Sequence, residues 1–201
     1  SGSLALRQFF HGKAKLISWV FGKPNHARTT LFNQHSSFNL KRHNSFLCLT
    51  PKCESHFKRF SHSNFVPWCI DHDFFTPNFK PNSLPKYFLA TGKTNRDYDT
   101  LIKAARFVDA EIRIIGPAAQ KPSELPNNVR WTNTSESPPD KAIDYPSLKR
   151  WYNNCVGVCV PLSGDANDTC GYTNMLEGMS MAKPVLMTDS GCLHLNPESG
   201  N

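Results

Sequence analysis

The sequence predicts an α/β fold: a Rossmann-like, doubly wound parallel sheet preceded by part of a second α/β domain. One indication is that short apolar runs rich in β-branched residues alternate with amphipathic stretches in the second half of the chain. Another is that polar or Gly-containing loops follow these runs, as they do at the carboxyl ends of parallel strands. A third is a Pro-rich stretch at 76–85 that separates two such patterns. We therefore expect an N-terminal domain at 1–77, a linker at 78–85 and a second domain at 86–201, incomplete at its C-terminal end.

In the first domain the clearest feature is a helix start. Thr50 suits an N-cap, Pro51 suits the first helical position, and Glu54 places an acid in the first turn. The elements expected in chain order are a strand in 12–22, a loose helix in 26–43, a strand at 45–50, a helix to about 60 and an extended segment from 65.

The second domain alternates strands with helices. The expected strands are 86–92, 110–116, 128–132, 156–161 and 185–187, and the expected helices are 98–107, 145–152 and one that begins after Gly171. A short strand, a loop, a helix and a further strand in succession form the repeating unit of a parallel sheet.

Charge is unevenly distributed along the 201 residues, which carry a net charge of +7. Residues 1–80 hold 11 Lys and Arg against 3 Asp and Glu, whereas residues 81–201 hold 12 against 13. A basic first half suits nucleic acid, an anionic membrane face or an acidic acceptor, and a merely solvated basic surface explains it equally well. No apolar run reaches the roughly 18 residues of a membrane span.

Cysteine usage indicates a reducing compartment. The seven Cys are odd in number and scattered, which is typical of core thiols, so we expect a cytoplasmic protein. The basic first half adds the expectation of peripheral contact with an anionic membrane face. A zinc site is the alternative for one group of Cys and His residues. Structural zinc needs four ligands that converge, whereas Cys48 falls in a predicted strand and Cys53 in a predicted helix. The whole group is Cys48, Cys53, His56, His62, Cys69 and His72.

Two loops of the second domain carry the candidate chemistry. Lys93 and Arg96 follow its first strand, where they would flank a pyrophosphate, unless both are simply solvated loop cations. Gly171 precedes a helix whose N-terminal N–H groups favour an anion. One turn in, the Glu177 carboxylate could accept two hydroxyl hydrogen bonds from a ribose diol, or merely cap its own helix in an ordinary βαβ unit.

The stretch GYTNMLEGMSMAKPV, residues 171–185, resembles the signature of GT-B-fold retaining glycosyltransferases of family 4, the group of sucrose and glycogen synthases. The residues that match are Leu176, Glu177, Met179, Pro184 and Val185. Gly178 and Ser180 replace Ala of the family, and Ala182 replaces its Gly. The second Glu that the family often carries eight residues earlier is Thr169 here. PWCIDHDFF, residues 67–75, is similar to the end of the family's N-terminal domain, with Cys69 in place of Gly.

The resemblance, which covers residues 45–190, implies retaining transfer of a sugar from a UDP- or GDP-sugar to an acceptor hydroxyl. It gives catalytic roles to Lys93, Arg96 and Glu177, of which the two cations align with family cations that contact the donor diphosphate. It implies that the donor is bound by Gly92, Trp131, Thr132, Thr169, Gly171, Tyr172, Thr173 and Asn174. It implies no cofactor and no required metal, and the acceptor is a carbohydrate, a lipid-linked molecule or a small molecule. Because only the end of an acceptor domain is present, we expect this chain alone to be weakly active or inactive.

Two other functions stay open. Thr169 in place of Glu and Ala182 in place of Gly suit a non-catalytic nucleotide- or phosphate-binding module. The basic first half suits nucleic-acid binding, which is not expected because no recognition motif is present.

Overall fold

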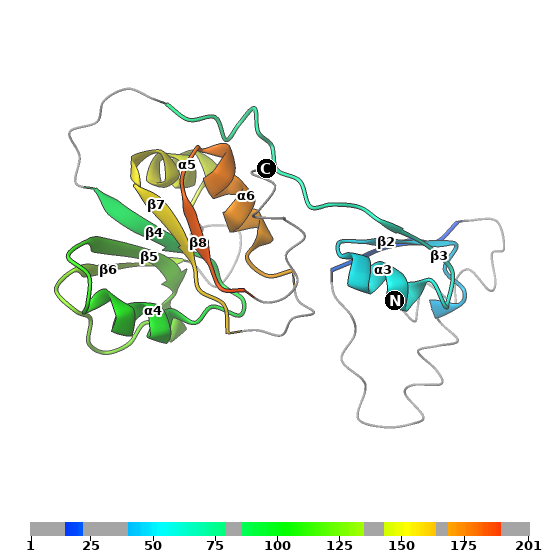
Figure 1. Ribbon diagram of the computed structural model, residues 1–201, viewed down its shortest axis with the longest axis horizontal. Helices are drawn as coiled ribbons and strands as arrows, with labels where there is room; N and C mark the ends of the chain where they lie inside the picture. Colours follow the sequence, from blue (N-terminus) through cyan, green and yellow to red (C-terminus); the bar gives the residue numbers. More distant parts are fainter. Residues whose placement is uncertain (1–14, 22–39, 79–85, 135–142, 164–168, 190–201) are drawn as a thin grey trace. The chain divides into compact units, whose positions relative to one another are not determined.

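The computed structural model describes residues 15–21, 40–78, 86–134, 143–163 and 169–189. The chain divides into two compact units. The described residues of the first unit lie within Ser1–Trp68 and Asp165–Thr169, and the second unit comprises Cys69–Gly164 and Cys170–Asp189 (Figure 1). Both units are α/β with parallel sheets, which confirms the predicted α/β class, and the five-stranded sheet of the second unit is consistent with a Rossmann-like fold.

The first unit contains a three-stranded parallel sheet in the order β1-β2-β3, formed by Ile17–Val20, Ser45–Cys48 and His62–Phe65. Helix α3, Pro51–Phe57, connects β2 to β3. It begins as predicted, because the Thr50 hydroxyl accepts a hydrogen bond from the Cys53 N–H at 3.0 Å. The extended segment predicted from 65 was placed too late, since β3 already ends at Phe65.

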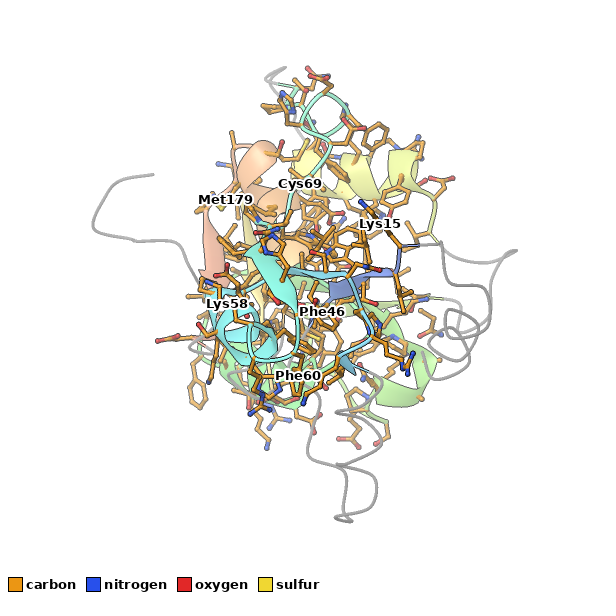
Figure 2. All side chains as sticks on the ribbon, turned by 90° about the vertical axis from the view of Figure 1, so that its right-hand side faces the viewer. Lys15, Phe46, Lys58, Phe60, Cys69 and Met179 are labelled. Carbon is orange, nitrogen blue, oxygen red and sulfur yellow. The ribbon has the colours of Figure 1, made fainter. Side chains whose placement is uncertain are left out.

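A small aromatic core joins this sheet to α3. Phe46 and Phe57 are buried with their ring centroids 4.8 Å apart, and the half-buried Phe60 packs against them. Cys48 and Cys53 fill the rest of this core as buried thiols. The side chains of Phe46 and Phe60 are labelled in Figure 2.

The second unit contains a five-stranded parallel sheet in the order β6-β5-β4-β7-β8. The strands are β4 (Tyr87–Thr91), β5 (Glu111–Pro117), β6 (Val129–Thr134), β7 (Gly157–Val160) and β8 (Val185–Met187). The chain builds outward from β4 in one direction and from β7 in the other. The point between β4 and β7 is therefore the topological switch point, where doubly wound sheets bind ligands.

Helices cover both faces of this sheet (Figure 1). Helix α4 (Tyr98–Ala105) packs on one face, where Ala90 points, and α5 (Tyr145–Asn154) lies on the other, where Leu89 points. Helix α6 (Tyr172–Ser180) packs against β7 and β8. The short 3-10 helix η1 (Ala118–Gln120) follows β5. The strands and α-helices match the sequence expectation to within two residues: α4 ends before Phe107, which is 89% exposed, whereas β6 and α5 each run two residues further than expected.

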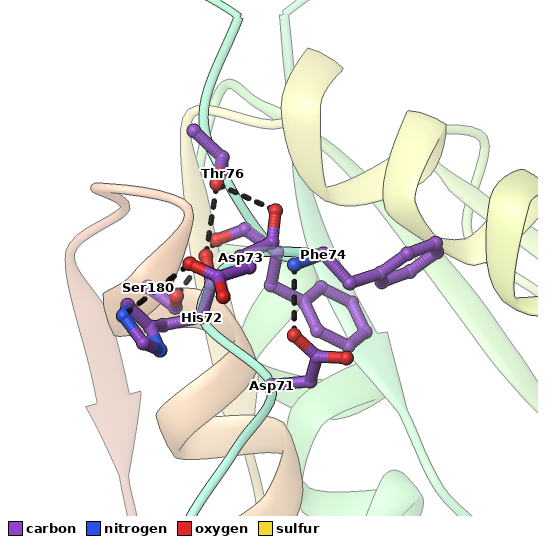
Figure 3. Close-up of polar contacts among 7 residues, drawn as sticks. Asp71, His72, Asp73, Phe74, Thr76 and Ser180 are labelled. Carbon is purple, nitrogen blue, oxygen red and sulfur yellow. Dashed lines mark hydrogen bonds and ion pairs between the residues drawn. The ribbon is translucent and has the colours of Figure 1, made fainter.

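The segment 69–78 belongs to the second unit, which thus begins before the linker predicted at 78–85. The Asp71 side chain accepts a hydrogen bond from the Phe74 N–H (Figure 3), and the Asp71 carbonyl accepts one from the Phe75 N–H. After this turn, the Phe75 ring is buried in the core of the second unit. The Ser180 hydroxyl of α6 then donates to the Phe75 carbonyl at 2.7 Å. The segment that resembles a domain end in the glycosyltransferases therefore packs against α6.

Two expectations fall largely outside the described residues, namely the loose helix at 26–43, apart from 40–43, and the linker, apart from Asn78. Within the described residues, every helix is too short or too polar to cross a bilayer.

Candidate functional site

The loop after β4 positions a cation at the switch point. Gly92 has φ +135°, and a Cβ on it would lie 2.5 Å from the Arg96 Nε and Nη2 atoms, so the missing side chain makes room for the guanidinium. Asp97 ends the loop by accepting the Thr100 N–H at 3.0 Å, which caps α4 and holds the pKa of Asp97 below its usual value. Arg96 is thus fixed between a strand end and a helix cap.

Arg96 donates three hydrogen bonds, all to neutral oxygens. Its Nε donates to the Thr91 carbonyl at 3.2 Å, its Nη1 to the Thr94 carbonyl at 2.7 Å and its Nη2 to the Asn174 side-chain oxygen at 2.5 Å. A guanidinium has five N–H groups, so two have no acceptor among the described residues. Arg96 takes no part in the ion pairs Lys58–Glu54, His72–Asp73 and Arg113–Glu111. Arg96 therefore lacks a carboxylate partner within that part of the chain, and an anion could accept its remaining hydrogen bonds.

Asn174 belongs to the first turn of α6, whose N-terminus is shaped by Gly171. Gly171 has φ +89°, and a Cβ there would lie 2.7 Å from Val160 Cγ1 on β7, so only glycine lets the helix start this close to the sheet. The cap residue offers no side-chain hydrogen bond, and the first turn holds no acid. The positive end of the α6 dipole thus adds to the charge of Arg96.

Glu177 lies one turn further along α6 and is only 1% exposed. Its Oε2 accepts a hydrogen bond from the Tyr152 hydroxyl at 2.7 Å and lies 3.4 Å from the Asn174 side-chain nitrogen. Burial raises the pKa of Glu177, and the two hydrogen bonds oppose that rise. Burial, together with the nearby carboxylate, raises the pKa of Tyr152 well above its ordinary value.

A cavity of about 580 Å³ adjoins Arg96 at the carboxyl edge of the sheet, within the volume range of small-molecule sites. It is lined by Arg96, Asp97, Tyr98, Asp99, Ala119, Gln120, Lys121, Pro122 and Ser163. Of the residues predicted for the site, only Arg96 lines it. Sequence reasoning missed Gln120 and Lys121, although their place just after β5 is a signal, because all strand ends of a parallel sheet meet at one edge.

The loops after β4 and β7 are joined across the switch point. The Asp97 N–H donates to the Pro161 carbonyl at 3.2 Å, and the Ser163 N–H donates to the Asn95 carbonyl at 3.1 Å. Between them, Arg96 and Leu162 form an isolated antiparallel bridge. The backbone that carries Arg96 is therefore held from both sides.

Three other residues predicted for the site, Lys93, Trp131 and Thr132, make contacts of their own and do not line the cavity. Lys93 is exposed, and its carbonyl accepts a hydrogen bond from Gln120 at 3.3 Å. Trp131 on β6 packs edge-on against Tyr98 at 5.1 Å, and its buried indole N–H lacks a partner within the described residues. Thr132 pairs with Ile115 in the ladder of β5 and β6.

Around α6, Gly171 and Tyr172 are buried, whereas Thr173 is half-buried. Thr169 is grouped with the first unit, where its hydroxyl donates to the Phe21 carbonyl at 3.1 Å. Within the second unit, the structure brings Gly92, Arg96, Asn174 and Glu177 into one chain of contacts.

The zinc alternative lacks support in the described part of the chain, which includes all six candidate ligands. There, no group of three or more Cys, His, Asp or Glu side chains is arranged to hold a metal ion. Cys48 and Cys53 instead lie in the core of the first unit, and burial raises the pKa of the Cys48 thiol to about 11.

Comparison of the chain with protein-family models and with curated proteins finds no match. Three features of the second unit remain to indicate a function: Arg96, which has no carboxylate partner among the described residues, the N-terminus of α6, and the cavity beside Arg96 at the carboxyl edge of the sheet. Together these features can bind a phosphorylated ligand and stabilise negative charge on it.

Proposed function

We propose that the second unit binds the nucleoside diphosphate of a UDP- or GDP-sugar, and that the chain is part of a GT-B-type retaining glycosyltransferase. The sugar is transferred to the hydroxyl of a carbohydrate, lipid-linked or small-molecule acceptor. The enzyme works in the cytoplasm, where basic residues of the first unit contact an anionic membrane face.

The contact between Arg96 and Asn174 carries this proposal. It joins the loop after β4 to the first turn of α6, so that a fixed cation and a helix dipole act on the same place. A diphosphate carries its charge on several oxygens, and a forked guanidinium with two unused N–H groups matches that geometry. The exposed Lys93 on the same loop supplies a second charge.

In the transfer step the bond between the sugar's anomeric carbon and the diphosphate oxygen breaks, and the diphosphate leaves with the electron pair. The acceptor oxygen forms the new bond on the same face of the sugar, and its proton passes to the departing diphosphate. Negative charge grows on the leaving group during this step. Arg96, Lys93 and the α6 N-terminus stabilise that charge more in the transition state than in the bound donor.

A non-catalytic nucleotide-binding module is the second candidate, and one observation favours it. Glu177, the residue that the family resemblance assigns to the donor, is 1% exposed and already hydrogen-bonded by Tyr152. If Glu177 does not reach the donor, the site has one side chain fewer on the ligand than the family resemblance implies. Such a site is better suited to holding a phosphate than to transferring a sugar.

Calorimetric titration with UDP, GDP and ADP at fixed salt tests the binding proposal. We expect one nucleotide to bind and Arg96→Gln to weaken its binding at least tenfold, in line with the loss of charge-assisted hydrogen bonds. Arg130→Gln is the matched control, because Arg130 is an exposed arginine on β6 that does not line the cavity. Equal affinities of wild type and Arg96→Gln would contradict the proposal.

Release of UDP or GDP from the corresponding sugar nucleotide separates the two candidates. Turnover that needs an acceptor and leaves the anomeric configuration unchanged supports the transferase. Tight nucleotide binding without turnover, in this chain and in any longer form of the protein, supports the binding module.

A further inference from the structure

We infer that Glu177 is a positioning residue, which holds Arg96 in its anion-binding orientation through the Asn174 amide instead of contacting the ribose of a donor. The nature of the anion rests on the function proposed above, but the chain of contacts does not. These contacts lead from the Glu177 carboxylate to the Asn174 amide and from that amide to the Arg96 guanidinium, and the Tyr152 hydroxyl lies beside the amide nitrogen.

The orientation of the Asn174 amide is fixed from both ends. Its oxygen faces Arg96 Nη2, which can only donate, so the amide oxygen must point toward the guanidinium. Its nitrogen then points toward Glu177 Oε2 at 3.4 Å and the Tyr152 hydroxyl oxygen at 3.3 Å. The amide dipole thus lies between a cation and a carboxylate, and each end stabilises the other.

The carboxylate is placed for this internal role. Glu177 is 1% exposed, and Oε2 accepts both hydrogen bonds that its neighbours supply. Tyr152 is itself fully buried, and its ring packs edge-on against Phe75 with the centroids 6.1 Å apart. Moving Glu177 outward to a ligand would leave the buried Tyr152 O–H without its acceptor, which is costly.

This arrangement predicts how the loss of Glu177 affects ligands. If the carboxylate acts through Arg96, then Glu177→Gln weakens every anion bound by Arg96, whether or not that anion carries a ribose. If the carboxylate contacts a ribose diol directly, the same change weakens a nucleotide and leaves inorganic pyrophosphate unaffected.

Calorimetry with UDP and with inorganic pyrophosphate separates these outcomes. We expect Glu177→Gln to weaken both ligands by the same factor, about five- to tenfold, and to have less than a twofold effect when Arg96 is already Gln. A loss confined to UDP would overturn the inference. So would equal losses with and without Arg96, because a general structural defect would not depend on that residue.

A measurement without ligand tests the positioning directly. We expect the Arg96 side-chain Nε–H in ¹⁵N NMR to exchange slowly with solvent in the wild type and several-fold faster in Glu177→Gln. The half-buried position of Asn174 makes Asn174→Ala the variant to use if Glu177→Gln does not fold, and it should show the same acceleration. Unchanged exchange in a folded variant would overturn the inference. If Arg96 is protected but neither UDP nor pyrophosphate binds, the proposed function fails and the positioning role stands.

Discussion

The Arg96 guanidinium and the Asn174 side chain, 78 residues apart in sequence, share a hydrogen bond of 2.5 Å across the switch point of the second unit. This contact links the loop after the central strand β4 to the start of α6. Each partner brings its own electrostatic contribution, a full positive charge from one and a helix N-terminus from the other. The proposed anion site is therefore made by folding and not by any one continuous motif.

Gly92→Ala should displace Arg96 and weaken pyrophosphate binding at least fivefold. The added Cβ would lie 2.5 Å from the guanidinium, and φ +135° is unfavourable for alanine. Gly157→Ala is the control, because its Cβ would lie 3.0 Å from the Phe88 ring, away from Arg96. Isothermal calorimetry on both variants checks this. Equal affinity in Gly92→Ala and the wild type would mean that the close packing of Gly92 against Arg96 is not needed for binding.

Ala182→Gly should raise the free energy of unfolding by about 1 kcal/mol. Ala182 has φ +53° and follows the end of α6 in a Schellman motif, in which the Ala182 N–H bonds the Met179 carbonyl and the Lys183 N–H bonds the Gly178 carbonyl. Ala104→Gly, at an exposed position within α4, is the control and should lower stability by about 1 kcal/mol. Urea unfolding measures both, and the same sign for the two substitutions would refute the argument.

Glu177 should make the protein less stable as the pH rises. Burial raises the pKa of this carboxyl above its ordinary value of 4.5, so between 4.5 and the folded-state pKa the folded protein binds more protons than the unfolded chain. The contribution of Glu177 to stability is therefore fully present below pH 4.5 and is lost as the pH rises from 4.5 through the folded-state pKa. Urea unfolding of wild type and Glu177→Gln across pH 4 to 8 tests this. The stability of the variant relative to the wild type should increase with pH, and a constant difference would contradict the prediction.

Thr50→Ala should lower the stability of the first unit by about 1 kcal/mol, because the Cys53 N–H at the start of α3 loses its acceptor. Thr50→Ser keeps a hydroxyl in the same place and should lose less than half as much. Amide exchange of α3 residues reports on this unit alone. Equal losses in the two variants would show that packing of the buried Thr50 methyl group, and not the cap, is what matters.

Local chemistry made much of the fold predictable. The cap at Thr50 and the apolar strands could be recognised because each depends on a few neighbouring residues. The αL position at Ala182 is where the resembling family carries Gly, so the helix end had a sequence signal even though the residue differs.

Long-range packing explains what could not be predicted. The spacing of α6 places Glu177 one turn into the helix, but its buried hydrogen bond comes from Tyr152 of α5, whose ring packs against Phe75 from before β4. The assignment of 69–78 to the second unit likewise depends on contacts with α6, which lies more than 90 residues later in the chain. Neither relationship leaves a local pattern in the sequence.

The most direct test of the proposed site is a crystal structure of the protein grown with UDP. We predict that diphosphate oxygens accept hydrogen bonds from the two unused Arg96 N–H groups and lie beside the first turn of α6, with Asn174 still bonded to Arg96. A UDP molecule bound elsewhere, with its phosphates out of reach of Arg96, would contradict the account.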